Sequence, residues 1–237
     1  MENAYIISEN CIYFMTSKMT GAFLVAGPIL LMLIFAVLWP GGNASGAEAL
    51  ELETANVNLT YLYMFIAGTS MVMIQSGLTF LSKCFCCCTD KANGDRKKLL
   101  QVANMLAITT VALFFVNGGL IHGSLRLFLA GNVEHAVILN TVANNGFNLI
   151  QWSFGVTLLI IGAVAIVGKH KPKIAQALVV PGALMVLTIF ISNDGLGFAS
   201  WLLMAAALVA TGASIPVSYT HLRAHETEAD LVCRLLL

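Results

Sequence analysis

Charged side chains are scarce in this sequence, and they are missing altogether from long stretches of it. Asp, Glu, Lys and Arg make up only 10% of the 237 residues, whereas a soluble domain carries roughly a quarter. Apolar residues reach 58% and the mean hydropathy is +0.85. Uncharged runs of this kind exclude an ordinary soluble domain and are typical of a chain that a lipid bilayer surrounds.

Motifs of known chemistry are also missing. The sequence has no serine-nucleophile elbow, zincin motif or phosphate-binding loop, and no basic face interleaved with aromatics that would indicate nucleic-acid binding. The central parts of the apolar runs contain no ionisable residue, although such residues mark proton relays and ion paths in membranes. We therefore expect no pump, no cofactor and no nucleic-acid partner. Enzymatic activity stays open, with its absence favoured.

The C-terminal segment differs in character from the rest. From Val217 the chain reads VSYTHLRAHETEADLVCRLLL, which resembles a translation of a transposase-type sequencing-library adapter, with two constant segments around an index of the expected length. The resemblance implies that residues 217–237 are an artefactual tail, which has to be excluded from reasoning about the fold. Its histidines and its cysteine receive no functional weight, and we expect the native sequence to be truncated near residue 216.

Six apolar runs have about the length that a transmembrane helix requires. They predict an all-α, polytopic transmembrane helix bundle with spans at about residues 21–39, 59–81, 99–116, 147–167, 175–191 and 196–215. Transmembrane β-barrels need alternating segments of about ten residues, which this sequence lacks. We expect residues 1–20 to form a cytoplasmic or interfacial segment and residues 21–215 to form one membrane domain.

The basic segment Lys83–Lys98 orients the bundle. Short loops rich in Lys and Arg stay cytoplasmic, and this one holds five of the twelve Lys and Arg residues. Of the twelve Lys and Arg residues, nine fall on predicted inner segments, one (Arg126) falls on a predicted outer segment, and two are in the tail. This bias alternates correctly across all six predicted spans. The pattern predicts a cytoplasmic N-terminus and a multi-pass protein whose partner is the lipid bilayer, with a homo-oligomer or a membrane-protein partner left open.

By helix count and loop charge, residues 1–215 resemble six-helix integral membrane proteins of microbial genomes. The resemblance covers no diagnostic motif and implies no activity. A competing interpretation takes the first run as a cleaved signal peptide, but the long leader before it and the length of the run disfavour cleavage.

Glycine, proline and asparagine predict where helices bend or end. Pro28 and Pro181-Gly182 predict kinks inside the first and fifth spans. Asn117-Gly118-Gly119 is a natural place for the third span to end or unwind. After it, residues 133–142 have helical spacing and are expected to run along the outer surface, and Asn144-Asn145-Gly146 predicts a turn before the fourth span.

Uncharged polar residues on the second, third and fourth spans allow two interpretations. They can join helices, because small residues permit close approach and amides bond across an interface, and this interpretation is favoured. They can also line the path of a solute. Along the fourth span one helix face carries five polar or small residues: Asn144, Asn148, Gln151, Gly155 and Gly162. The candidates for lining a solute path are Gln75, Asn104, Asn117, Asn148 and Gln151.

A second polar group is expected at the outer face. His122 and Arg126 are one helical turn apart, and Glu134 and His135 follow closely in sequence. A small anion or metal site is one interpretation, but two histidines without further ligands make a poor metal site. An arginine that reaches the lipid headgroups, paired with Glu134 or Asp194, is favoured. No metal site is predicted.

Four cysteines lie where the second span meets the cytoplasm: Cys84, Cys86, Cys87 and Cys88. Cysteines on a cytoplasmic loop are expected to be reduced, so no disulfide framework is predicted. S-acylation of a juxtamembrane cysteine and no role at all are comparable interpretations.

Three hypotheses for the function follow. The first is a membrane protein that binds or passes a small neutral solute through a bundle lined by Asn, Gln, Ser and Thr. The alternative is a non-catalytic membrane assembly or lipid-interacting subunit whose polar residues only pack helices. The third is an outer-face membrane enzyme that uses His122 and Arg126.

Overall fold

The computed structural model describes residues 2–42, 44–87, 94–168, 173–191 and 194–235, with side chains described from Lys18 and up to Ile215. Within these ranges every regular element is a helix and none is a strand. The elements are α1 (Glu2–Leu33), the π-helix η1 (Ile34–Leu38), α2 (Gly46–Ala55), α3 (Val57–Cys87), α4 (Gly94–Leu129), α5 (Val133–Gly168), the 3₁₀-helix η2 (Lys173–Leu178), α6 (Val179–Leu187) and α7 (Asp194–Leu235).

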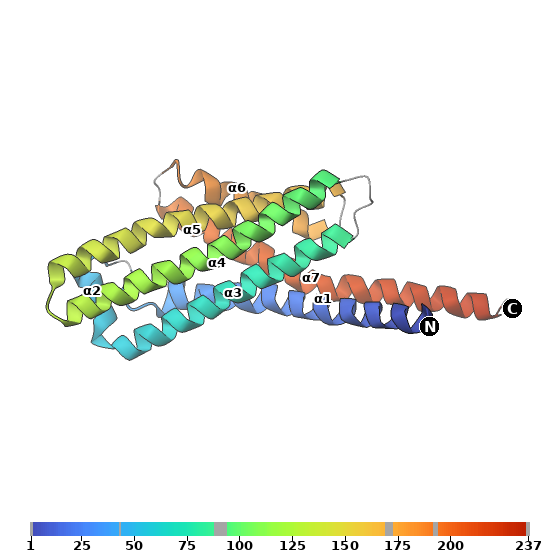
Figure 1. Cartoon of the computed structure of the whole chain (residues 1–237), viewed down its shortest axis with the longest axis horizontal. Helices are drawn as coiled ribbons and strands as arrows, with labels where there is room; N and C mark the ends of the chain where they lie inside the picture. The colour runs from blue at the N-terminus through green and yellow to red at the C-terminus, as the bar shows by residue number, and fades with distance from the viewer. Residues whose placement is uncertain (1, 43, 88–93, 169–172, 192–193, 236–237) are drawn as a thin grey trace.

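The long helices from α1 to α5 alternate in direction along the chain (Figure 1). Helices α1 and α4 run one way along the bundle, and α3, α5 and α7 run the other way. We call the end where α3 finishes and α4 begins the Lys83 end, and the end where α1 finishes the Trp39 end. Among the described residues, Lys83, Arg96, Lys97 and Lys98 lie at the Lys83 end, and Arg126 lies toward the Trp39 end, in the last turn of α4.

Five helices are long and apolar enough to cross a membrane: Lys18–Leu38, Val57–Phe85, Gly94–Leu129, Val133–Gly168 and Gly195–Ile215. The prediction of an all-α membrane-type bundle is therefore confirmed at this level, and each of these helices contains one predicted span. Helix α1 continues without a break from Glu2 through the first span, so the expected N-terminal segment is part of the same helix.

The predicted fifth span, residues 175–191, is not one long helix. It consists of η2 and the short α6, together Lys173–Leu187, followed by turns up to residue 191. With a rise of about 2.0 Å per residue in the 3₁₀ part and about 1.5 Å in the α part, this piece is about 25 Å long, shorter than a hydrocarbon core of about 30 Å. Pro181 and Gly182 lie inside α6, where both are buried.

Two predicted helix breaks are wrong. Helix α4 continues through Asn117, Gly118 and Gly119, and α5 continues through Asn144–Gly146. Each helix has 36 residues, and the two form a long antiparallel hairpin (Figure 1). A glycine costs an isolated helix about 1 kcal/mol, which packing along the whole hairpin offsets. Gly146 serves close packing rather than a turn, because a Cβ there would stand 3.1 Å from the Asn117 Oδ1 atom.

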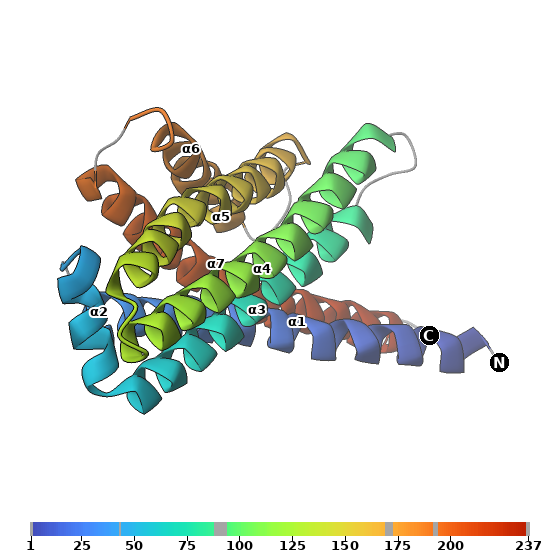
Figure 2. The same cartoon turned by 60° about the vertical axis from the view of Figure 1, so that its left-hand side comes forward.

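Helix α1 packs between α3 and α7, and α5 packs between α4 and α6. Figure 2 shows α6 on the side of α5 that faces away from α3. Gly212 of α7 permits the approach to α1, because a Cβ there would lie 2.7 Å from the Gly21 carbonyl oxygen. The main core runs along these contacts and is built from large buried side chains such as Leu24, Met71 and Phe154.

The Trp39 end is closed by α2, which lies across the end of the α4–α5 hairpin (Figure 2). A small second core joins the three helices through Leu50, Leu125 and Ala136. The chain reaches α2 through a turn at residues 40–42, where Gly42 has a positive φ of 49°. The expected loop between the first two spans is thus a helical cover, and it forms one wall of the site described next.

Candidate functional site

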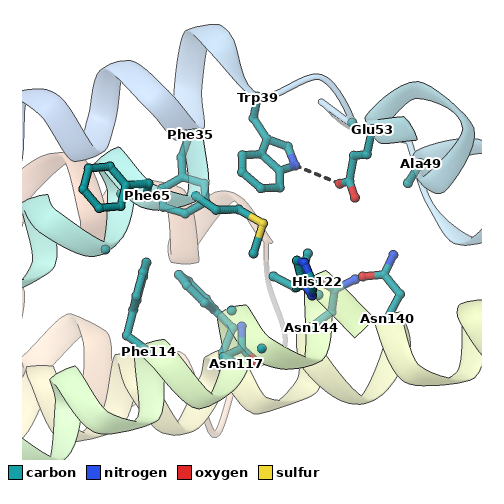
Figure 3. A pocket seen from close by; sticks show the side chains of 18 of the residues that line it. Phe35, Trp39, Ala49, Glu53, Phe65, Phe114, Asn117, His122, Asn140 and Asn144 are labelled. Carbon is teal, nitrogen blue, oxygen red and sulfur yellow. Dashed lines mark hydrogen bonds between the residues drawn. The ribbon is translucent and has the colours of Figure 1, made fainter. Parts of the chain in front are cut away.

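A cavity of about 560 Å³ lies at the Trp39 end, between the end of α1, the cover helix α2 and the facing parts of α3, α4 and α5. Its size falls in the range of about 300–1,000 Å³ that is usual for small-molecule sites. Six Phe and Trp rings line it, and polar groups reach it from α2, α4 and α5 (Figure 3). The side chains used below are Phe35, Trp39, Glu53, Phe65, Asn117, His122, Asn140, Asn144 and Phe147.

Glu53 is the acidic residue on the cavity wall, and it is buried. Only 6% of it is exposed. The indole Nε1 of Trp39 donates a hydrogen bond of 2.9 Å to its Oε1 atom, which Figure 3 shows. Its other oxygen, Oε2, is buried and has no hydrogen-bond partner among the described residues. A buried oxygen without a partner is costly, so this atom is a natural contact point for a ligand.

The backbone around Glu53 holds its carboxylate in place. The Thr60 hydroxyl of α3 donates a 2.7 Å hydrogen bond to the Glu53 carbonyl oxygen, which ties α2 to α3. Gly41 lies directly against the carboxylate, since a Cβ there would stand 2.8 Å from Glu53 Oε1. Burial raises the pKa of the Glu53 carboxyl, and the hydrogen bond from Trp39 opposes this shift in part. Glu53 lies in α2, outside the five candidate spans.

Asn117 of α4 supplies a second polar atom without a partner. It is 8% exposed, and its Oδ1 atom forms no hydrogen bond within the described part of the chain. The two glycines after it leave open space beside the helix because they have no side chain. A Cβ at Gly118 would only touch the Met64 methyl group at 3.8 Å, and a Cβ at Gly119 would meet nothing within 4 Å. The Asn117-Gly118-Gly119 sequence thus shapes the cavity rather than breaking the helix.

The aromatic wall is a connected set of rings. Phe35 lies 5.5 Å from Trp39 and 6.3 Å from Phe147, measured between ring centroids. Phe147 in turn lies 5.5 Å from Trp201 of α7. These separations are typical of favourable aromatic pairs, so the rings that face the cavity are held from behind by the bundle core.

The predicted outer polar cluster is only partly assembled. His122 lies on the cavity wall, with its ring 4.8 Å from that of Tyr61. It also lines a neighbouring groove together with Arg126. Glu134 and His135 are exposed and line neither space, and His135 Nδ1 lies 2.7 Å from Asn132 Oδ1. Among the described side chains Arg126 makes no ion pair, and the side chain of Asp194 lies outside them.

Of the residues predicted to line a solute path, only Asn117 reaches the cavity. Gln75 is buried in the core, with its Nε2 atom 3.8 Å from Met71 Sδ. Asn104 accepts a 2.6 Å hydrogen bond from the Ser82 hydroxyl, and Asn148 is exposed on the bundle surface. The structure therefore does not bring these amides together around one channel.

Gln151 and the glycines near it join helices. The Gln151 amide donates a hydrogen bond of 2.6 Å to the Thr188 hydroxyl, beyond the end of α6, and a longer one of 3.4 Å to Ser200 of α7. A Cβ at Gly155 would stand 2.8 Å from Met185 Cβ, and one at Gly162 would stand 2.7 Å from a backbone nitrogen of α6. At this level the polar face of α5 contacts α6 and α7.

The cysteine cluster and metal binding gain no support from the described residues. Cys84 is a half-buried cysteine near the end of α3, and the side chains of Cys86, Cys87 and Cys88 lie outside the described set. No group of three or more His, Cys, Asp or Glu side chains with metal-binding geometry occurs in the part of the chain that the structure describes.

No protein-family model matches the chain, and no curated protein or solved structure matches it significantly. What the protein does must therefore be argued from the cavity and the residues around it.

Sequence reasoning missed Trp39 and Glu53 as partners. In the sequence, Trp39 is the last residue of the first predicted span, and Glu53 lies between the first two predicted spans. The available signal was weak: Glu53 has helical spacing with Ala49 and Leu50, which are both buried, so it falls on the inner face of a short helix.

Proposed function

We propose that this chain is a multi-pass integral membrane protein that binds a small solute in the cavity at the Trp39 end. The observation that carries the proposal is the pair of buried polar atoms without partners, Glu53 Oε2 and Asn117 Oδ1, on the wall of a space of about 560 Å³. Polar groups that are buried in a folded protein almost always have a partner. A bound solute with hydrogen-bond donors would supply partners for both atoms.

The proposed topology has a cytoplasmic N-terminus and six crossings, with η2 and α6 as a short fifth crossing. Its support is the loop charge and the alternating direction of the helices in Figure 1, in which α6 also runs from the Lys83 end toward the Trp39 end. In this arrangement the cavity opens near the outer face. Tags inserted after Trp39 and within residues 88–93 should report opposite compartments, and the same compartment for both would overturn the topology.

Solute binding can be tested with a variant that fills the cavity. Gly118→Leu places a side chain in the space next to Met64, and Gly197→Leu on α7 is the matched control, because a Cβ there meets nothing within 4 Å and the residue does not line the cavity. Both proteins are purified into phosphatidylcholine nanodiscs, and benzyl alcohol and benzylammonium are titrated by calorimetry. The proposal expects binding to the unmodified and Gly197→Leu proteins and loss of binding in Gly118→Leu.

The helix contacts of Gln151, Gly155 and Gly162 favour a second candidate for the polar face of α5, namely a non-catalytic membrane component whose polar residues pack helices. This candidate accounts for α5 and α6 but leaves the two unpartnered atoms of the cavity without a role. An outer-face enzyme built on His122 and Arg126 gains no supporting contact from the described residues, so no catalytic residue is proposed.

A further inference from the structure

Resting on the proposed function, we infer that the solute is a small organic ammonium ion, with Glu53 as its counter-ion and the Trp39 and Phe35 rings beside its charge. The inference goes beyond a solute site by naming the chemical class of the ligand. It departs from the sequence-based expectation of a neutral solute, and it rests on three features of the cavity wall: its charge, the type of its unpartnered atoms, and its rings.

The charge of the cavity favours a cation. Glu53 is buried, and no Lys, Arg or His nitrogen lies within ion-pair distance of it among the described side chains. His122 is the other titratable side chain on the wall, and it contacts the Tyr61 ring instead. A buried carboxylate without a counter-ion is unfavourable unless a partner arrives. An anionic ligand would be repelled by the ionised carboxylate, and a neutral ligand would leave the carboxyl to the protonated form that burial favours, whereas a bound cation stabilises the ionised form.

The unpartnered atoms favour a ligand with several donors. Glu53 Oε2 and Asn117 Oδ1 are both acceptors, and they project from opposite sides of the cavity, from α2 and from α4 (Figure 3). A primary ammonium group carries three N–H donors, as the lysine side chain does. Trp39 already satisfies Oε1, so it leaves Oε2 as the oxygen that the ammonium group can contact.

The rings and the size of the space favour an organic cation over a bare ion. A cation over the face of a Trp or Phe ring within about 6 Å of its centre is attracted by the ring quadrupole. Phe35 and Trp39 form an adjacent pair at 5.5 Å, and Phe65, Phe114 and Phe147 add apolar wall. About 560 Å³ is far more room than an inorganic cation needs, and no metal-binding group of three ligands occurs in the described ranges.

The test compares two probes of one shape in three proteins. Benzylammonium and benzyl alcohol are titrated by calorimetry into the unmodified protein, Glu53→Gln and Gly118→Leu, all in nanodiscs of net-neutral phosphatidylcholine so that lipid charge does not bind the cation. Glutamine keeps an oxygen that accepts the Trp39 hydrogen bond but carries no charge. We expect the unmodified protein to bind benzylammonium at least about tenfold more tightly than the alcohol, about 1.4 kcal/mol, and Glu53→Gln to remove the preference.

A third probe, benzyltrimethylammonium, separates charge from hydrogen bonding. It keeps the charge and has no N–H donor, so it should bind more weakly than benzylammonium to the unmodified protein, and Asn117→Ala should narrow that difference. Equal binding of both cations would overturn the donor part of the inference.

The outcomes separate this inference from the proposed function. If the alcohol and the ammonium bind equally and Gly118→Leu abolishes both, the ammonium inference is overturned and the solute site stands. If Gly118→Leu leaves the binding of every probe unchanged, or if no probe binds the unmodified protein, the site itself is wrong and the inference is overturned with it.

Discussion

Replacing Trp39 with phenylalanine tests whether the bond between the end of α1 and the cover helix α2 holds the cavity together. The change keeps an aromatic ring beside Phe35. It removes the indole N–H, which donates a hydrogen bond of 2.9 Å to Glu53 Oε1. Both carboxylate oxygens are then buried without a partner. A hydrogen bond to a charged group contributes about 1.5–3 kcal/mol, so we expect the free energy of unfolding to fall by about that amount at a pH where Glu53 is ionised.

The pH dependence of this loss has a definite sign. Burial raises the pKa of Glu53 above its ordinary value of 4.5, and the Trp39 bond favours the ionised form. The stability lost on Trp39→Phe should therefore be smallest below pH 4.5, where the carboxyl is protonated in both the folded and the unfolded chain. Because the substitution removes a bond that lowers the pKa of Glu53, this loss should grow as the pH rises through the folded pKa and become constant above the higher folded pKa of the variant.

Thermal unfolding followed by circular dichroism in detergent measures the effect, at about 2–4 °C per kcal/mol for a chain of this size. Trp152→Phe is the matched control, because Trp152 is 42% exposed and does not line the cavity. The reasoning is refuted if Trp39→Phe and Trp152→Phe lower the melting temperature equally, or if the penalty of Trp39→Phe is largest in acid.

Three further substitutions address neighbouring contacts. Gly41→Ala should push the Glu53 carboxylate away from the indole, and it should add little to the loss already caused by Trp39→Phe in the double variant, whereas additive losses would contradict a shared contact. Gly155→Leu should lower stability by about 1–3 kcal/mol through overpacking against α6, as measured by thermal unfolding beside Gly197→Leu, which should be nearly neutral. Gln151→Leu should cost about 1 kcal/mol, the usual size of one interhelical hydrogen bond in a membrane protein, and solute binding at the cavity should stay intact.

Sequence reasoning predicted the features that bilayer physics controls. A run of apolar residues long enough to cross hydrocarbon has few alternatives to a helix, so five of the six predicted spans coincide with long helices. The first span ends near Trp39-Pro40 as predicted, because the proline nitrogen has no hydrogen to donate to a helical hydrogen bond. Gly42 then adopts a positive φ, which turns the chain toward α2.

The errors fall where one helix packs against another. Gly118, Gly119 and Gly146 were interpreted as helix breakers from local propensity, but long-range packing of α4 on α5 decides their conformation, and propensity is only a weak prior. Residues 175–191 were expected to span by hydropathy alone. The 3₁₀ start of this segment accompanies the close approach of Gly162 and Gly182 to the facing helix, which no local pattern shows.

The contact between Trp39 and Glu53 could not be predicted because it depends on where α2 folds back. The two residues are 14 positions apart across a turn whose path the sequence does not determine. Loop acids contribute little to membrane orientation, so no pattern distinguished Glu53 from Glu48 and Glu51, which are both exposed.

The length of the α4–α5 hairpin affects how a ligand would arrive. A helix of 36 residues extends about 54 Å, whereas the oily interior of a bilayer is about 30 Å deep. Measured from the charged residues at the start of α4, about 30 Å of helix ends close to Gly118, which lines the cavity. In the proposed topology, a ligand would therefore reach the cavity from the outer headgroup layer without crossing the whole bilayer, and binding would need no transport.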